Sequence, residues 1–170
     1  MNSLKPTTTE TLMLPSGRSV SVRKATPKFS QWHGENPAPI DARHGKKGLL
    51  DFDGTPLFAE FVILKLLKND GWRGYWVDTY CKSFRASWGR APRKALPDRP
   101  SAVPRKIWDL AKIRSGVWDV FAWKGDRVLF CESKKSKKDV IQKSQREFAD
   151  TAIDAGLPLE SLLLVEWRDA

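Results

Sequence analysis

The feature of this sequence that most constrains its fold is the segment GVWDVFAWKGDRVLFCESK, residues 116–134. Two runs of β-branched and aromatic residues flank Gly125-Asp126, which predicts an antiparallel hairpin with glycine in the tight turn. Closing the hairpin at this turn places Asp119 directly opposite Glu132, near its open end. Directly opposed side chains in an antiparallel pair have Cβ atoms about 5 Å apart, so we expect two carboxylates that repel each other.

Lys134 adds a third charged group to this pair. Residues two apart in a strand share a face, so Lys134 is expected beside Glu132. Opposed carboxylates are destabilising unless a cation lies between them or one of them keeps its proton. A divalent cation with oxygen ligands meets that need most simply. The alternative is an exposed hairpin in which Lys134 pairs with Glu132 or Asp119.

The composition indicates one folded, basic domain. The chain has 170 residues, 41% of them hydrophobic, with eight tryptophans, which is enough for a single core. Its formal net charge of +10 favours a polyanionic partner, most simply nucleic acid, although a membrane surface or a ribosome also suits a basic chain. No apolar run approaches the ~20 residues that span a bilayer, and the N-terminus lacks the apolar stretch of a signal peptide, so we expect a cytoplasmic protein.

Cysteine and histidine are sparse. Cys81 and Cys131 are too few for a disulfide framework, and no histidine or cysteine lies at zinc-finger spacing. Cys131 belongs to the strand face opposite Glu132 and is expected to be a small buried side chain. His33 and His44 lie in Gly/Pro-rich surroundings without a partner motif, so both are expected to be loop residues.

Residues 1–54 are predicted to form an N-terminal extension to a domain that covers residues 55–170. Residues 1–10 are polar and threonine-rich, which is typical of disorder. A short hairpin is expected around the turn signal at residues 15–18, because strand-forming runs flank it. Clusters of Pro and Gly at residues 25–48 indicate an irregular surface segment with no sign of catalysis.

A helix is predicted for residues 56–69, with Thr55 as N-cap and Gly71 soon after its end. At helical spacing, Glu60 falls among leucine and isoleucine side chains on the inward face. A buried carboxylate is costly unless it is paired or bound to a cation. Glu60 is therefore expected either to meet a Lys or Arg or to reach the site of Asp119. A third explanation stays open, because the helix dipole favours an acid in the first turns.

A strand at residues 74–80, in which Asp78 is expected to hydrogen-bond at the strand end, precedes a basic insertion at residues 81–114. Basic side chains there are interleaved with aromatic ones, which suits contact with phosphates and stacking on bases or sugars. The alternative is a solvated loop whose aromatic side chains anchor it to the core. A short helix is expected at residues 104–113. The residues singled out for nucleic-acid contact are Arg85, Trp88, Arg90, Arg93 and Lys94.

A second helix is predicted from about residue 136 to residue 155, followed by a last strand at residues 162–167. Gln145 is the one polar side chain on the sheet-facing row of this helix. A buried amide needs partners, so we expect Gln145 beside Lys134, where it can hold a water or a phosphate. Helix starts favour anions, and the basic residues that crowd this one include Lys135, Lys137 and Lys138.

The order helix, strand, hairpin, helix, strand resembles the αβββαβ core of the PD-(D/E)XK nuclease superfamily. This resemblance implies an α/β, restriction-endonuclease-like fold, with a central mixed sheet flanked by helices. The segments GVWDVFAW, FCESK and QREFADTAIDAG are similar to the VRR-NUC-type and resolvase-like branch, in which the ExK strand leads into a helix bearing a glutamine. The resemblance covers roughly residues 56–167, without the basic insertion. Trp118 stands before Asp119, where the superfamily name has proline.

The same resemblance implies an Mg²⁺- or Mn²⁺-dependent nuclease. Glu60 would correspond to the acid of the first helix and Gln145 to the helix glutamine. The remaining site residues that it implies are the metal ligands Asp119, Glu132 and the Ser133 carbonyl, with Lys134 orienting the attacking water. The expected substrate is DNA, including branched or structured DNA, with RNA left open, and paired cuts would favour a homodimer or a larger protein partner. The alternative is a catalytically silent nucleic-acid-binding module or a partner-dependent subunit with the same fold.

Overall fold

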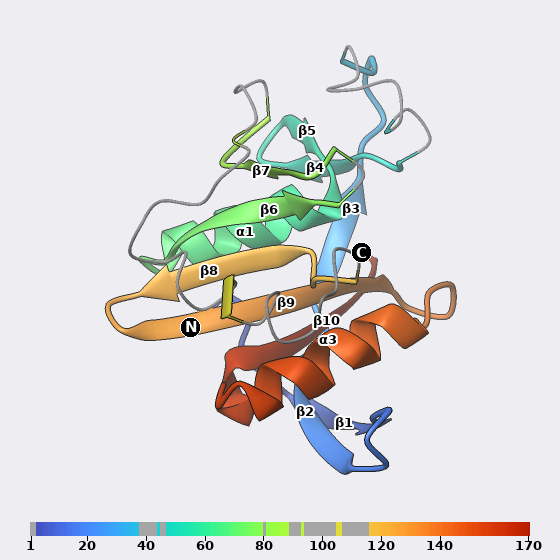
Figure 1. Ribbon diagram of the computed structural model, residues 1–170. Coiled ribbons are helices and arrows are strands. Elements are labelled where there is room, and N and C mark those ends of the chain that lie inside the picture. Colours follow the sequence, from blue (N-terminus) through green and yellow to red (C-terminus); the bar gives the residue numbers. More distant parts are fainter. Residues whose placement is uncertain are drawn as a thin grey trace.

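The computed structural model describes residues 3–37, 44, 47–79, 81–88, 93, 105–106 and 116–170. Its described part is an α/β protein with a mixed sheet and two helices, α1 (Ala59–Asn69) and α3 (Lys143–Asp154) (Figure 1). The predicted α/β class with a mixed central sheet is confirmed. Neither described helix combines the length and the apolar composition that crossing a membrane requires.

Ten described strands belong to one sheet. Its order is β5-β4-β3-β10-β9-β8-β6-β7, and β2 pairs with both β10 and β1. The pairs β6–β8 and β8–β9 are antiparallel, whereas β9–β10 and β10–β2 are parallel. The strand bounds are β1 Thr8–Met13, β2 Ser19–Ala25, β3 Lys28–Gln31, β4 Leu50–Phe52, β5 Thr55–Leu57, β6 Arg73–Asp78, β7 Ser83–Arg85, β8 Val120–Lys124, β9 Arg127–Lys135 and β10 Leu162–Asp169.

The hairpin β8–β9 forms with the register expected from its turn. Lys124 pairs with Arg127, and the ladder continues to Val120 opposite Cys131. Gly125, in the turn, has a φ of 59°, a left-handed conformation that glycine adopts without steric cost. The predicted hairpin and its register are confirmed, so the residues on either side of the ladder's end, before β8 and within β9, come together.

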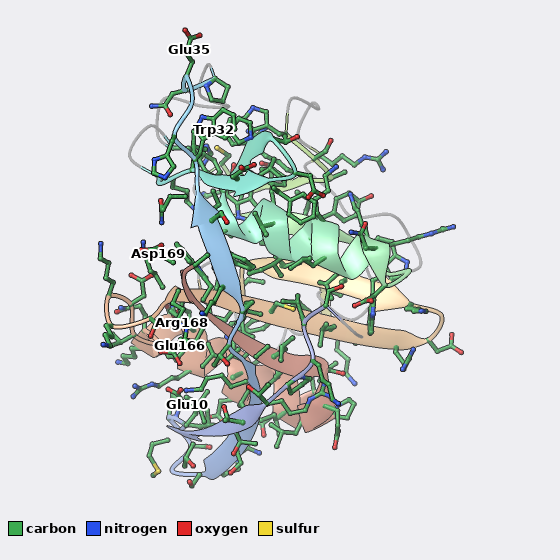
Figure 2. All side chains as sticks on the ribbon, turned by 180° about the vertical axis from the view of Figure 1, so that it is seen from behind. Glu10, Trp32, Glu35, Glu166, Arg168 and Asp169 are labelled. Carbon is green, nitrogen blue, oxygen red and sulfur yellow. The ribbon has the colours of Figure 1, made fainter. Side chains whose placement is uncertain are left out.

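The helices cover opposite faces of the sheet (Figures 1 and 2). Val120 and Ala122 of β8 belong to a core cluster with the apolar side of α1. Phe121, between them, belongs to a second cluster with Phe148 of α3. This alternation is the pattern of a strand that is buried on both faces. Cys131 is fully buried in the α1-side cluster, as predicted.

The predicted start of α1 is wrong. Thr55–Leu57 form β5, which pairs with β4 around a tight turn at Asp53-Gly54. Both turn residues have positive φ, 51° and 75°, the geometry that an Asp-Gly turn supplies to a two-residue hairpin. The helix therefore begins only at Ala59, and Pro56 lies in a strand that pairs with β4 on one side.

The predicted start of α3 is also too early. The chain after β9 makes a turn in which Asp139 Oδ2 accepts a hydrogen bond from Lys135 N at 2.9 Å. Lys137 in this turn has a φ of 63°, which is not a helical conformation. Helical geometry starts at Lys143, after Gln142 as N-cap. Ser136 and Asp139 therefore belong to the turn that precedes α3, and they do not mark the start of the helix.

The N-terminal residues pair closely with the rest of the sheet. The expected hairpin is present but longer, joining β1 to β2, and the predicted disorder of residues 1–10 is wrong for the strand residues Thr8–Glu10 and for Leu4, which is 1% exposed. Lys24 of β2 forms ion pairs with Glu10 and Glu166, both labelled in Figure 2.

Two further expectations concern residues 25–48, before α1, and residues 104–113, after β6. The stretch expected to be irregular, residues 25–48, contributes the strand β3. The helix expected at residues 104–113 lies outside the described residues, apart from Arg105 and Lys106.

Candidate active site

The three charged side chains predicted on the hairpin lie together. Asp119 directly precedes β8, and its Oδ2 accepts a hydrogen bond from Ser133 N at 2.9 Å. Glu132 of β9 is 1% exposed, and its Oε1 lies 2.8 Å from Lys134 Nζ. Lys134 is 9% exposed, so its ammonium belongs to the same buried corner. This group of Asp119, Glu132 and Lys134 is called the acidic corner below.

The surroundings of the acidic corner raise the pKa values of both its carboxyl groups. Burial, followed by the negative charge of Glu60, raises the pKa of Asp119 to about 6. Burial, followed by the charge of Asp119, also raises the pKa of Glu132 well above its ordinary value, although Lys134 acts in the opposite direction. Two neighbouring carboxylates with raised pKa values are what a site shows when its acids are pressed together without enough positive charge.

One oxygen of Glu132 has no donor. Its Oε2 is buried and lacks a hydrogen-bond partner among the residues that the structure describes. Asp119 is a neighbouring acid whose negative charge helps to raise the pKa of Glu132, after burial. A buried carboxylate oxygen without a donor is costly. A proton shared with Asp119 or a bound cation would remove this cost.

Gln145 connects α3 to the acidic corner. Its Nε2 donates to Glu132 Oε1 at 2.5 Å, while its own Oε1 accepts from Gln142 N at 2.8 Å. The carbonyl of Gln145 accepts from the indole of Trp118 at 3.1 Å. The structure thus places the predicted glutamine beside the predicted acids and orients its amide from the helix start.

Glu60 also reaches this region, from α1. Its side chain is largely buried, as predicted, and forms an ion pair with the ammonium of Lys47. That ammonium lies 5.0 Å from the ring centre of Trp76 and 5.6 Å from that of Phe58. Glu60 therefore meets a lysine and lies in the first turn of α1, as two of the expected explanations require, and its negative charge also acts on Asp119. Lys47 was not predicted.

Two of the residues expected to contact nucleic acid have internal roles instead. Arg85 is 6% exposed, and its Nε donates to Asp78 Oδ2 at 3.1 Å, which confirms Asp78 as a hydrogen-bonding residue at the strand end. Trp88 packs on the core, with its ring centre 4.7 Å from that of Phe58. The alternative of aromatic side chains that anchor this stretch therefore holds for Trp88. Arg93 is exposed. Outside the described residues lie Arg90 and Lys94.

The basic residues after β9 lie at the surface beside the acidic corner. Lys137 and Lys138 are exposed in the turn that follows β9. Lys135 already has partners within the protein, because its Nζ lies 2.8 Å from Asp169 and 4.9 Å from the ring centre of Trp167. The two exposed lysines are therefore those that remain available to an anionic partner.

A second cluster, formed by His44, Asp78 and Cys81, was not predicted. One ligand atom from each lies within 4.8 Å of the others, and His44 is 2% exposed. His44 Nε2 lies 3.3 Å from Asp78 Oδ1, so the expectation of a loop histidine is wrong about its surroundings. The carboxylate of Asp78 also binds Arg85, and hydrogen bonds from Cys81 and Arg85 outweigh burial and lower its pKa. Nitrogen and sulfur ligands suit zinc better than magnesium.

Comparison with known proteins found no matching family model, no matching curated protein and no matching solved structure. The interpretation of the acidic corner therefore depends on its own residues: what they contact, how deeply they are buried and which charges they carry.

Proposed function

We propose that this chain is a divalent-metal-dependent nuclease that hydrolyses phosphodiester bonds in DNA, built on a restriction-endonuclease-like core. The observation that carries the proposal is the pairing of half-buried Asp119 with buried Glu132, whose Oε2 has no hydrogen-bond partner among the described residues, with Lys134 beside them. The succession α1, β6, β8, β9, α3, β10 supports it, because it follows the helix and strand order of that core.

The residues present fit a hard cation. Asp119 and Glu132 would hold the ion, and the carbonyl of Ser133, whose own N–H donates to Asp119, would complete a set of oxygen ligands that Mg²⁺ and Mn²⁺ prefer. Burial and neighbouring negative charge raise both carboxylate pKa values, and the positive charge of such an ion would act against both causes. When bound, it supplies a Lewis acid that lowers the pKa of a water ligand and offsets negative charge on a phosphate.

Lys134 supplies a fixed positive charge. One of its N–H groups faces Glu132 Oε1, and a protonated lysine has two more to offer to a water or a phosphate oxygen. Because Lys134 is only 9% exposed, its charge acts in a region with little water and is weakly screened. Gln145 holds Glu132 in place through Oε1, which leaves Oε2 directed at the cation position.

The charge of the chain supports DNA as the substrate. The net charge is +10, and the exposed Lys137 and Lys138 follow Lys134 within one turn of chain. Lysines at this place can bind the phosphates that flank a scissile bond, and such contacts carry no sequence preference. We therefore assign them to backbone binding and not to base recognition.

The proposal is tested by cleavage of supercoiled, branched, single-stranded and duplex DNA with Mg²⁺ or Mn²⁺. We expect cleavage by the unchanged protein, and a loss of about 100-fold or more in Glu132→Gln and in Lys134→Met, because each removes one charged group from the reacting centre. Lys143→Met is the matched control, since the side chain of Lys143 on α3 is 87% exposed and makes only a 3.9 Å ion pair.

DNA affinity separates chemistry from binding. Fluorescence anisotropy in Ca²⁺ should give dissociation constants for both variants within a few-fold of the unchanged protein, because the corner is buried. Cleavage that survives Glu132→Gln would contradict the assignment of the site, whatever its metal dependence.

A second candidate function is DNA binding without cleavage. The observation that favours it is the presence of two lysines, Lys47 and Lys134, which already neutralise much of the acidic group. In that case no metal would produce cleavage on any substrate, affinity would fall steeply with salt, and Glu132→Gln would leave binding unchanged.

A further inference from the structure

Lys47 brings a positive charge into contact with Glu60 from outside the predicted site. Its ammonium forms an ion pair with Glu60 and lies over the rings of Trp76 and Phe58, at 5.0 and 5.6 Å from their centres. Aromatic faces attract cations. The side chain of Lys47 is 36% exposed and that of Glu60 is 11% exposed, so the lysine enters from the surface and its charged end is held by buried groups.

The charges of this pair act on Asp119, which also interacts with Glu132. The carbonyl of Asp119 accepts a hydrogen bond from Val77 N at 2.7 Å, which fixes it beside β6, the strand that carries Trp76. Its Oδ2 accepts a hydrogen bond from Ser133 N, the residue after Glu132, at 2.9 Å, and the charges of Glu60 and Lys47 also act on its carboxylate. Asp119 therefore has two acidic neighbours, Glu132 and Glu60. A cation can bind between Asp119 and either of them.

We propose that Glu60 and Asp119 form a second cation subsite beside Asp119 and Glu132, and that the ammonium of Lys47 occupies it in place of a second metal ion. The proposal rests on the metal site proposed above. The protein then binds one divalent ion, between Asp119 and Glu132, and Lys47 supplies the positive charge on the side of Glu60.

The charges of the region favour this division. Three carboxylates, Glu60, Asp119 and Glu132, face two ammonium groups, Lys47 and Lys134. One negative charge is left uncompensated, and a single divalent ion more than neutralises it. A second divalent ion would have to displace Lys47 or lie against it, and like charges in a buried site are costly.

The number of bound Mn²⁺ ions tests the proposal. The electron paramagnetic resonance signal of free Mn²⁺ is titrated against the unchanged protein and against Lys47→Gln. We expect one bound ion per chain in the unchanged protein and two in Lys47→Gln, with broadening of the bound signal because the two ions share Asp119. Lys47→Arg, which keeps the cation, should bind one, and Lys65→Gln, at an exposed position of α1, should also bind one.

A further variant identifies the ligand of the second ion. Adding Glu60→Gln to Lys47→Gln should return the count to one, because the subsite loses one of its two carboxylates. Circular dichroism and thermal melting of each variant check that the fold is retained, and if Lys47→Gln does not fold, Lys47→Met is used in the same titration.

The possible counts distinguish the two proposals. Two ions in the unchanged protein, or one ion in folded Lys47→Gln, would overturn the role of Lys47 and leave the site at Asp119 and Glu132 in place. No bound ion in any variant would overturn both, and would do so at the metal site of the proposed function itself.

Discussion

The carboxylate of Asp119 makes the stability of the metal-free protein depend on pH. The pKa of this group is raised from 3.8 to about 6, so the folded state holds its proton more tightly than the unfolded state does. Between these two pH values the folded state binds more protons, and stability from this group therefore falls as pH rises. Below pH 3.8 none of this stability is lost, and above about pH 6 the loss is complete.

We expect Asp119→Asn to remove this dependence, because asparagine keeps the shape and an acceptor for Ser133 N without the charge. In EDTA, the variant should unfold like the unchanged protein near pH 3.8 and be more stable above about pH 6. The gain should be at most about 3 kcal/mol, since one pKa unit corresponds to about 1.4 kcal/mol. Urea unfolding across this range measures it, with Asp126→Asn in the exposed hairpin turn as control. A constant difference at all pH values would contradict the prediction.

Single residues of the acidic corner were predictable where local geometry decided their position. Asp119, Glu132 and Lys134 follow from the register of one short hairpin, and the inward position of Gln145 follows from helical spacing. Lys47 was not predictable in this way, because it lies outside any described helix or strand and meets Glu60 only through the tertiary fold.

His44 illustrates the same limit at the other cluster. It is far from Asp78 in the sequence, and its Gly/Pro-rich surroundings suggested an exposed loop, yet it is buried against that carboxylate. Chain-local patterns carry no information about a contact of this kind, whereas Asp78 at the end of a strand could be assigned from its position alone.

At the scale of elements, the segment before β8 is held against the start of α3. Gly116 has a φ of 83°, and a Cβ at this position would overlap the backbone carbonyl of Ser144. Trp118, fully buried, donates its indole N–H to the carbonyl of Gln145 at 3.1 Å. These two contacts hold the segment that ends at Asp119 against α3, the helix whose Gln145 binds Glu132.

Replacing Gly116 should therefore cost more than a left-handed glycine usually does. Gly156, at the other end of α3, has a similar φ of 87° but no atom within 4 Å of a built Cβ. We expect Gly156→Ala to destabilise by about 1–2 kcal/mol through backbone strain alone, and Gly116→Ala by about 1–3 kcal/mol more through overlap. Urea unfolding of both variants provides the comparison, and equal losses would show that Ser144 yields without cost.

The elements themselves were predicted where one signal dominated. The β8–β9 hairpin formed rung by rung as expected, because a glycine turn and alternating strand residues agreed. The predicted start of α1 was wrong because Thr55 and the helical pattern after it indicate a helix start, whereas Asp53-Gly54 directly before them is a strong hairpin signal. Both residues of that turn have positive φ, which strands β4 and β5 need and a helix start does not.

At the scale of the whole molecule, the net charge of +10 would govern the affinity for DNA under the proposed function. Each lysine that contacts a phosphate steepens the dependence of log affinity on log salt by about 0.9. We expect the double variant Lys137→Gln, Lys138→Gln to flatten this slope by about 2, because both side chains are exposed beside the acidic corner. Anisotropy titrations at several salt concentrations measure the slope, in Ca²⁺.

Lys28→Gln with Lys65→Gln is the matched control, since it removes the same charge from exposed positions on β3 and α1. A slope that changes equally in both double variants would mean that the field of the whole surface, and not the turn after β9, determines binding.

The place of β10 in the sheet has a consequence for how the chain matures on the ribosome. This strand is made after the other described strands, yet it lies in the middle of the sheet, parallel to β9 on one side and to β2 and β3 on the other. The early strands must therefore wait, unpaired along that edge, until residues 162–169 leave the exit tunnel. Pairing of β10 joins β9 to β2 and β3 in one step. Nascent chains halted before β10 would therefore expose unpaired strand edges, which are prone to aggregate unless chaperones bind them.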